Sequence, residues 1–134
     1  MFKEIKYLSV EKIIEYNFLV LTLIKVKKAD QPKVASQRKI EFIVQACKEL
    51  EGDIYDKAVF LLKNIIKLHA FASGNRRTAF IATKEFVTEN GERFNIIDDP
   101  LQAKIMLGVR EGYYTDEEIK EWIKHGKIKP FKRI

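Results

Sequence analysis

Apolar residues recur every three or four positions along most of the chain, which is the spacing of a helix with one buried face. Stretches of this kind predict six helices, at about residues 9–24, 37–50, 54–69, 75–91, 100–112 and 115–126. The first helix is expected to bury an apolar face made of Val10, Ile13, Ile14, Phe18 and Leu21. The fourth is apolar on nearly all sides, as the central helix of a bundle usually is.

Residues that favour helix ends lie at several of the expected boundaries. Ser9 can cap the first helix, and Asp99-Pro100 supplies an N-cap followed by proline at the first helical position. Thr115–Glu118 has the pattern of a capping box. Gly91 and Gly126 are suited to the position just after a helix end. The boundaries predicted from periodicity are therefore supported by local chemistry.

One polar segment interrupts the helical pattern. Lys25–Gln37 predicts a loop or flap between the first two helices, in which Val26 and Val34 can pair as a short hairpin. The predicted fold class is all-α, a single bundle of about six helices with a flap between helices 1 and 2. We expect one domain over residues 1–126 and a basic C-terminal tail over residues 127–134.

The composition is that of an ordinary globular protein. Of 134 residues, 46% are hydrophobic and 33% are charged, so the chain can bury a core. The single cysteine, Cys47, excludes an internal disulfide and fits a buried helix position. The apolar run Phe18–Ile24 is too short to span a membrane, and Met1–Glu4 lacks the layout of a signal peptide. A cytoplasmic location is therefore expected.

The chain is basic, with a formal net charge of +6, and the excess is concentrated in residues 25–39 and 120–133. Such charge either covers a solvated surface with a frayed tail, or attracts an acidic partner such as a nucleotide, a nucleic acid or an acidic protein. A nucleic-acid-binding module is the least favoured interpretation. The sequence has neither a recognition-helix signature nor interleaved surface aromatic residues.

The segment with the most chemistry joins the third and fourth helices, where His69 precedes the run Gly74-Asn75-Arg76-Arg77. A helix N-terminus favours anions because it presents free N–H groups and the positive end of the helix dipole. Gly74 lets the backbone approach a phosphate, Asn75 can donate its amide, and the two arginines add charge. His69, expected to point inward along the apolar stripe, can accept a proton from an attacking hydroxyl. Singly these are ordinary turn, capping and surface residues, but in this order they favour a nucleotide-dependent transferase.

Residues 69–77 read His-x-Phe-x-x-Gly-Asn-x-Arg, which resembles the signature of the Fic/Doc family. Asn75–Ala79 is closer to the Doc (death-on-curing) branch, which has a basic residue followed by Arg-Thr-Ala where the Fic branch has a second glycine. Phe80 stands where the Fic branch has its second arginine. Shorter likenesses, which extend the resemblance to most of the chain, lie at Tyr7–Glu11, Asn90-Gly91, Gly108–Gly112 and Thr115–Ile123.

This resemblance implies a helical bundle that transfers AMP, or in the Doc branch phosphate, from ATP to a hydroxyl of a target protein. His69 would be the catalytic base, and Asn75 and Arg77 the other catalytic residues, with Arg77 as the phosphate clamp. The flap, residues 25–37, would align the target through backbone hydrogen bonds. A separate antitoxin is the expected partner of a Doc-like toxin. The nucleotide-binding turn would consist of Ser73, Gly74, Asn75, Arg76 and Arg77.

One departure from the family pattern leaves an alternative open. The family usually has Asp or Glu at the position of Ser73, where the carboxylate holds Mg²⁺ with the nucleotide phosphates. A serine hydroxyl is a weak, neutral ligand for Mg²⁺, so Ser73 is expected at most to touch an ion carried by ATP, directly or through water. No residue is therefore predicted as a metal ligand. The alternative is a catalytically silent protein that binds nucleotide or phosphate on the same fold.

Overall fold

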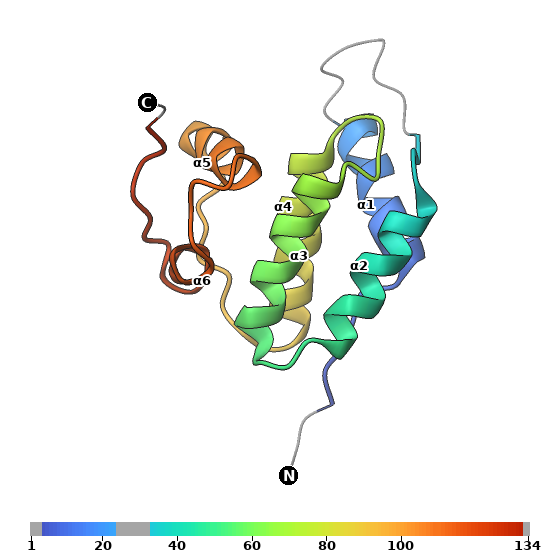
Figure 1. The fold of residues 1–134 in the computed structure, drawn as a ribbon, viewed down its shortest axis with the longest axis horizontal. Coiled ribbons are helices and arrows are strands. Elements are labelled where there is room, and N and C mark those ends of the chain that lie inside the picture. Colours follow the sequence, from blue (N-terminus) through green and yellow to red (C-terminus); the bar gives the residue numbers. More distant parts are fainter. Residues whose placement is uncertain (1–3, 24–32, 133–134) are drawn as a thin grey trace.

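The computed structural model describes residues 4–23 and 33–132, and within these ranges it is a bundle of α-helices without a β-strand (Figure 1). This confirms the all-α prediction, and the predicted boundaries agree with the observed ones to within two residues. No helix in the described ranges is both long and apolar enough to cross a membrane. The six helices are α1 (Val10–Leu23), α2 (Gln37–Glu49), α3 (Ile54–Leu68), α4 (Asn75–Glu89), α5 (Pro100–Arg110) and α6 (Asp116–His125).

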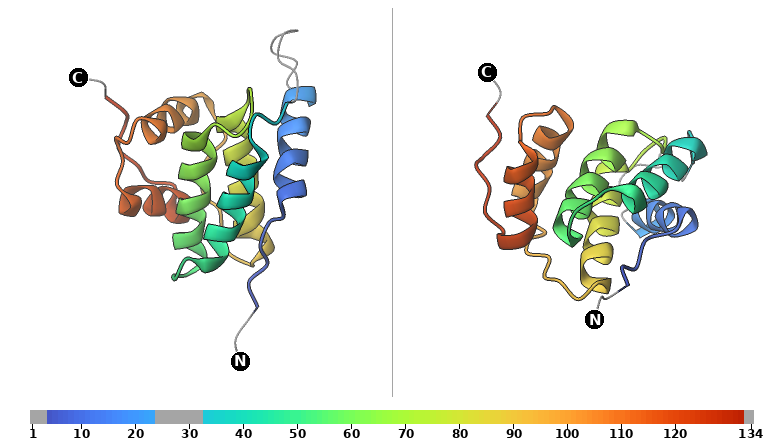
Figure 2. Two further views of the ribbon diagram at one scale, coloured as in Figure 1. Left: turned by 45° about the vertical axis from the view of Figure 1, so that its right-hand side comes forward. Right: turned by 60° about the horizontal axis from the view of Figure 1, so that its bottom comes forward.

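Helices α3 and α4 form a central hairpin with two helices on each side (Figure 1). Helix α1 packs against α4, and α2 packs against α3 and α1, while α5 and α6 both pack against the other side of α3. Two further views keep this division (Figure 2). The turn that joins α3 to α4 therefore lies beside the end of α1 and the start of α2, and this end of the bundle carries the motif.

The buried side chains form two clusters. The larger one lies between α3, α4 and α6 and contains Leu62, Phe86 and Ile123, all fully buried. The smaller one joins α1 and α2 to the α3–α4 turn, and it includes Phe71, which is 2% exposed. Phe71 therefore anchors the turn. The lone cysteine, Cys47, is also buried as predicted, and burial raises the pKa of its thiol to about 11.

The buried face of α1 agrees with the predicted one at Ile13, which is 1% exposed, but differs from it at Phe18. Phe18 was expected in the core but is 54% exposed, whereas Tyr16 and Asn17 are 7% and 2% exposed. The spacing of apolar residues, taken by itself, places Phe18 on the buried face. The observed face turns Tyr16 into the main core and brings Asn17 to the α3–α4 turn, where its amide is hydrogen-bonded. The apolar pattern does not reveal this polar contact of Asn17, which forms only when the observed face is buried.

The helix ends are capped largely as predicted. The Ser9 hydroxyl accepts from the Lys12 N–H at 3.1 Å, and Asp99 caps α5 by accepting from the N–H groups of Leu101 and Gln102. Thr115 and Glu118 form the predicted capping box at the start of α6.

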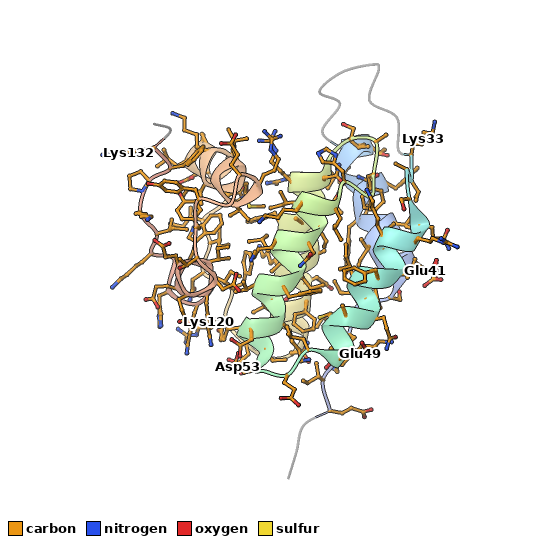
Figure 3. The ribbon with its side chains drawn as sticks, in the orientation of Figure 1. Lys33, Glu41, Glu49, Asp53, Lys120 and Lys132 are labelled. Carbon is orange, nitrogen blue, oxygen red and sulfur yellow. The ribbon has the colours of Figure 1, made fainter. Side chains whose placement is uncertain are left out.

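A second capping box, which sequence analysis did not identify, opens α3. Asp53 accepts from the N–H of Asp56, and the Asp56 carboxylate accepts from the N–H of Asp53. The ammonium group of Lys120 on α6 lies 2.9 Å from the Asp56 carboxylate and 3.8 Å from Asp53. Figure 3 shows Asp53 and Lys120 close together where α6 meets the start of α3. The cap thus also ties α6 to the central hairpin.

The C-terminal segment is docked on the bundle over its described residues, so a frayed tail is ruled out for 127–132. The Tyr114 hydroxyl donates to the Lys129 carbonyl at 2.9 Å, and the Lys129 ammonium lies 3.1 Å from Glu118. The ring of Phe131 packs edge-on against Tyr113. Aromatic packing and one ion pair therefore hold this segment, which was predicted to be a basic tail from its charge alone.

Candidate active site

His69 leaves the helix instead of extending it. Helix α3 ends at Leu68, and His69 takes the left-handed conformation with φ 51° and ψ 52°. Among the non-glycine residues that the structure describes, it alone has a positive φ. The prediction that its side chain points into the interior is wrong, because this turn takes His69 out of the helical register and leaves it exposed. An exposed imidazole at this position is accessible to a substrate hydroxyl.

Asn75, the first residue of α4, closes the turn onto itself. Its carbonyl oxygen Oδ1 accepts from the N–H of Phe71 at 3.2 Å, and its amide nitrogen Nδ2 donates to the carbonyl of Phe71 at 2.9 Å. The same nitrogen lies 3.2 Å from Nδ1 of His69. Because an amide NH₂ group can only donate, a neutral His69 in this arrangement accepts at Nδ1 and carries its proton on Nε2. Asn75 therefore shapes the turn and orients the imidazole, and its predicted contact with phosphate stays a prediction.

The start of α4 is partly buried and lacks a side-chain cap. Gly74 occupies the N-cap position with φ 78° and ψ 17°, and no side chain accepts a hydrogen bond there. The N–H groups of a helix's first turn have no partner within the helix, so this end can bind an anion. Arg76 in the same turn is exposed to solvent. These features are compatible with an anion-binding turn, which stays a prediction.

Asn17 on α1 holds this turn from behind, and sequence analysis did not single it out. Its amide nitrogen donates to the carbonyl of Ser73 at 2.8 Å and to the hydroxyl of Thr78 at 3.1 Å. A Cβ added at Gly74 would lie only 3.1 Å from a methyl group of Leu21 and 3.3 Å from the amide nitrogen of Asn17. Glycine is therefore needed here both for its φ and for space. The one available signal was a polar residue within the apolar stripe of α1.

Arg77, the predicted phosphate clamp, is already paired with a carboxylate. Its Nη1 and Nη2 donate to the two oxygens of Asp98 at 2.7 and 2.8 Å, which is a bidentate ion pair. The guanidinium also lies over the ring of Phe80, 5.2 Å from its centroid. Asp98 lies in the segment between α4 and α5 and was not predicted as a site residue. The two residues are 21 positions apart, so no local pattern joins them.

The pair changes the ionisation of both partners. Hydrogen bonding from Arg77 holds the pKa of the Asp98 carboxyl below its usual value, against an opposing effect of burial, and the charge of Lys84 adds to the lowering. The hydrogen bond to Asp98 raises the pKa of the Arg77 guanidinium. Both groups are therefore charged near neutral pH, and the pair is held by opposite charges.

The turn does not provide a metal site of its own. Within the described residues there is no group of three or more His, Cys, Asp or Glu side chains placed to hold a metal ion. Ser73 is partly buried, and its carbonyl group is bound by Asn17. The residues of this turn therefore do not fit a protein-held Mg²⁺ ion.

The structure describes only the second part of the predicted flap. Residues 25–32, including Val26 of the predicted hairpin, lie outside the described residues, and Gln37 is already the first residue of α2. Val34, the other residue of that predicted pair, forms an antiparallel bridge with Phe71. The N–H groups of Ala35 and Ser36 donate to the carbonyl of Ala70 at 2.8 and 3.0 Å, and the N–H of Ala72 donates to the carbonyl of Lys33 at 3.0 Å. These main-chain groups of residues 33–36 therefore bind the motif turn and are not free for a target.

The arrangement brings together an exposed histidine, a helix start suited to an anion, and an arginine with a bidentate edge. No curated protein matches the chain significantly. The family model described as the Fic/DOC family matches residues 7–87, which is more than half of the chain and includes α1 to α3, most of α4 and the whole motif turn. The chain therefore belongs to the Fic/Doc family.

Proposed function

We propose that this protein transfers a nucleotidyl or phosphoryl group from ATP to a hydroxyl of a target protein, as a toxin of the Doc kind. The family is known for transferring AMP or phosphate groups. The observation that carries the proposal is the link between His69 and Asn75, because their 3.2 Å contact joins an exposed imidazole to the first residue of the anion-binding helix. A proton acceptor and a phosphate site so close together favour transfer chemistry.

The proposed step needs only groups of this turn and the two substrates. The target hydroxyl attacks a phosphorus atom of ATP, and an O–P bond forms while the bond to the leaving phosphate oxygen breaks. Attack at the α-phosphate releases pyrophosphate and leaves AMP on the target, whereas attack at the γ-phosphate releases ADP. The hydroxyl proton passes to the imidazole of His69. The N–H groups at the start of α4, with Arg76 and Arg77, stabilise the negative charge on the phosphate oxygens.

His69 must present an unprotonated nitrogen for this step. In this turn that nitrogen is Nδ1, which faces the amide of Asn75. We infer that the ring gives up this contact when the substrates bind, so that the lone pair faces the target hydroxyl. The exposed position of His69 is compatible with such a rotation.

The assignment to the Doc branch rests on the residues that follow Asn75. Arg76-Arg77-Thr78 matches the basic residue and Arg-Thr of that branch, and Phe80 replaces the second arginine of the Fic branch. A Doc-like protein is expected to have a separate antitoxin as partner. The target segment would contact residues 25–37, of which the described part already binds the motif turn. ATP is proposed as co-substrate, and no step is assigned to a metal ion.

A catalytically silent protein on the same fold is the second candidate. It is favoured by Ser73, which gives the turn a hydroxyl where an acidic residue is usual, and by the lack of a metal-binding cluster within the described ranges. Such a protein would bind ATP without transferring any part of it.

The test uses ATP labelled at the α-phosphate in one sample and at the γ-phosphate in another. The purified protein is incubated with each sample, Mg²⁺ and an extract of its host. Label from the α position on a protein band indicates AMP transfer, and label from the γ position alone indicates a kinase. His69→Ala is expected to abolish labelling, and His125→Ala, a change at the exposed end of α6, serves as the matched control.

Two outcomes would contradict the proposal. Labelling that survives in a folded His69→Ala variant would remove the role of His69 as base. ATP binding without any label above that variant would favour the silent protein, and Ser73→Asp would then be the substitution to examine.

A further inference from the structure

The ion pair between Arg77 and Asp98 uses the edge of the guanidinium that a phosphate would need. Arg77 lies in the first turn of α4, where the proposed function places phosphate. Arginine holds a phosphate best through two parallel N–H···O bonds from one edge of its planar fork. Nη1 and Nη2 make such a pair of bonds to the carboxylate of Asp98.

The alternative edge of Arg77 is closed. Its Nε is buried and has no hydrogen-bond partner within the described part of the chain. The face of the guanidinium lies over Phe80, a core residue that is 3% exposed. A ligand that binds Arg77 in bidentate fashion therefore meets the Nη1–Nη2 edge, where Asp98 already sits.

Asp98 can be displaced without breaking a helix. It lies after α4 and before Asp99, the N-cap of α5, in a segment without regular structure, and its side chain is 50% exposed. Besides Arg77, its carboxylate accepts a long hydrogen bond of 3.4 Å from the amide of Gln102. Its contact with Arg77 is thus the main one to be exchanged for contacts with a ligand.

We propose that Asp98 is an internal carboxylate that competes with the phosphates of the ligand for Arg77 and so lowers the affinity of the site for anions. The inference rests on the proposed function, because it concerns regulation of the same phosphate site. Binding then requires the ligand to displace Asp98, and the displaced carboxylate stays close enough to repel the bound phosphate. Asp98 acts through Arg77 and is not itself a catalytic residue.

The experiment measures the dissociation constant for inorganic pyrophosphate by NMR, with the Nε–H signal of Arg77 as the reporter. Competition predicts that Asp98→Asn binds pyrophosphate about threefold to tenfold more tightly than the unmodified protein, since an exposed ion pair of good geometry is removed. Asp98→Glu keeps the carboxylate and is expected not to gain affinity. Glu92→Gln removes the same charge beyond the far end of α4 and is expected to change the affinity less than about twofold.

The opposite role makes the opposite prediction. If Asp98 only holds Arg77 in place, Asp98→Asn will bind pyrophosphate equally or more weakly, and the inference is overturned. Undiminished binding by Arg77→Gln, or no binding by any variant, would overturn it too. Thermal unfolding checks that each variant is folded.

The same variants separate this inference from the proposed function. If the protein labels its target from ATP but Asp98→Asn gains no affinity for pyrophosphate, the inference is contradicted and the proposed function stands. If Asp98→Asn gains affinity for pyrophosphate but the protein transfers no label, only the proposed function is contradicted.

Discussion

Helices α6 and α4 begin in opposite ways. Helix α6 has a capping box, Thr115 with Glu118, and its first turn is acidic, which suits the positive end of the helix dipole. Helix α4 begins at a glycine without a side-chain cap, and its first turn carries two arginines, which this end of the dipole disfavours. The capping box stabilises the start of α6, whereas the start of α4 has no side-chain cap and carries two arginines, of which Arg77 is paired with Asp98.

The start of α4 is held instead by one residue from another helix and by hydrogen bonds within the motif turn. Asn17 reaches it from α1, and Asn75 binds back across the turn to Phe71. The comparison indicates that local preference was given up at the site and that long-range contacts keep it in place, as is common where function conflicts with stability. The predictions that follow test this division.

The largest effect is expected for Asn17→Ala. It removes a buried donor and leaves the Ser73 carbonyl and the buried Thr78 hydroxyl unsatisfied, so the free energy of unfolding should fall by about 2–3 kcal/mol. Binding of ATP should weaken as well, because the turn is released. Asn64→Ala is the control, since Asn64 bonds only the carbonyl of Phe60 in its own helix among its described contacts and should cost less than about 1 kcal/mol. Equal losses in urea unfolding would show that Asn17 does not hold the turn.

Gly74→Ala should be next in size. A side chain at φ 78° costs about 1–2 kcal/mol, and its Cβ would also crowd Leu21 and Asn17. Gly112→Ala is matched in conformation, with φ 76°, but its Cβ would meet no atom closer than the Lys67 ammonium at 3.9 Å. Urea unfolding should therefore show a larger loss at Gly74, and ATP binding should fall at Gly74 only. Indistinguishable variants would remove the argument from crowding.

Thr115→Ala breaks the self-capped helix and should cost about 1 kcal/mol of stability. Because α6 lies on the opposite side of α3 from the motif turn's partners, the affinity for ATP is expected to stay unchanged. A thermal unfolding curve and an ATP titration on the same sample would check both parts. A clear loss of ATP affinity would mean that the start of α6 and the motif turn are energetically coupled.

The smallest effect concerns acid stability at the start of α3. Hydrogen bonds from Lys120 and from the Asp53 N–H lower the pKa of Asp56 below 3.8. Its ionised form therefore stabilises the folded state above that value, and this stabilisation is lost as the pH falls through the lowered pKa. Asp56→Asn should be less stable near neutral pH but lose less on acidification, as measured by urea midpoints at about pH 7 and about pH 3. An unchanged pH dependence would exclude Asp56 as a contributor.

Much of the fold follows from the sequence because helix periodicity and caps are local. The spacing of apolar residues located all six helices. Asp99-Pro100 and Thr115 marked the starts of α5 and α6. The motif likewise placed His69 close to Asn75, since only a short turn separates the end of α3 from the start of α4, and the two side chains are in contact.

What the sequence did not reveal depends on contacts between distant segments. Asn17 bonds to a turn more than 50 positions away, and Asp98 meets Arg77 from beyond the end of α4. Phe18 was wrongly placed in the core for the same reason, because Phe18 and Tyr16 are equally apolar in pattern and only the neighbours of the helix distinguish them. The left-handed turn at His69 is a further case, since helix periodicity would have continued through it.

The backbone bonds between residues 33–36 and residues 70–72 make these two segments one mechanical unit. Since the bonds use main-chain atoms, side chains at Lys33, Val34 and Ala35 can be exchanged without cutting the connection. A partner that pulls on the chain just before α2 would also pull on the turn that carries His69. Force applied at Lys33, which Figure 3 shows at the end of the bundle where the motif turn lies, is thus transmitted through its hydrogen bond with Ala72 to the turn that follows His69.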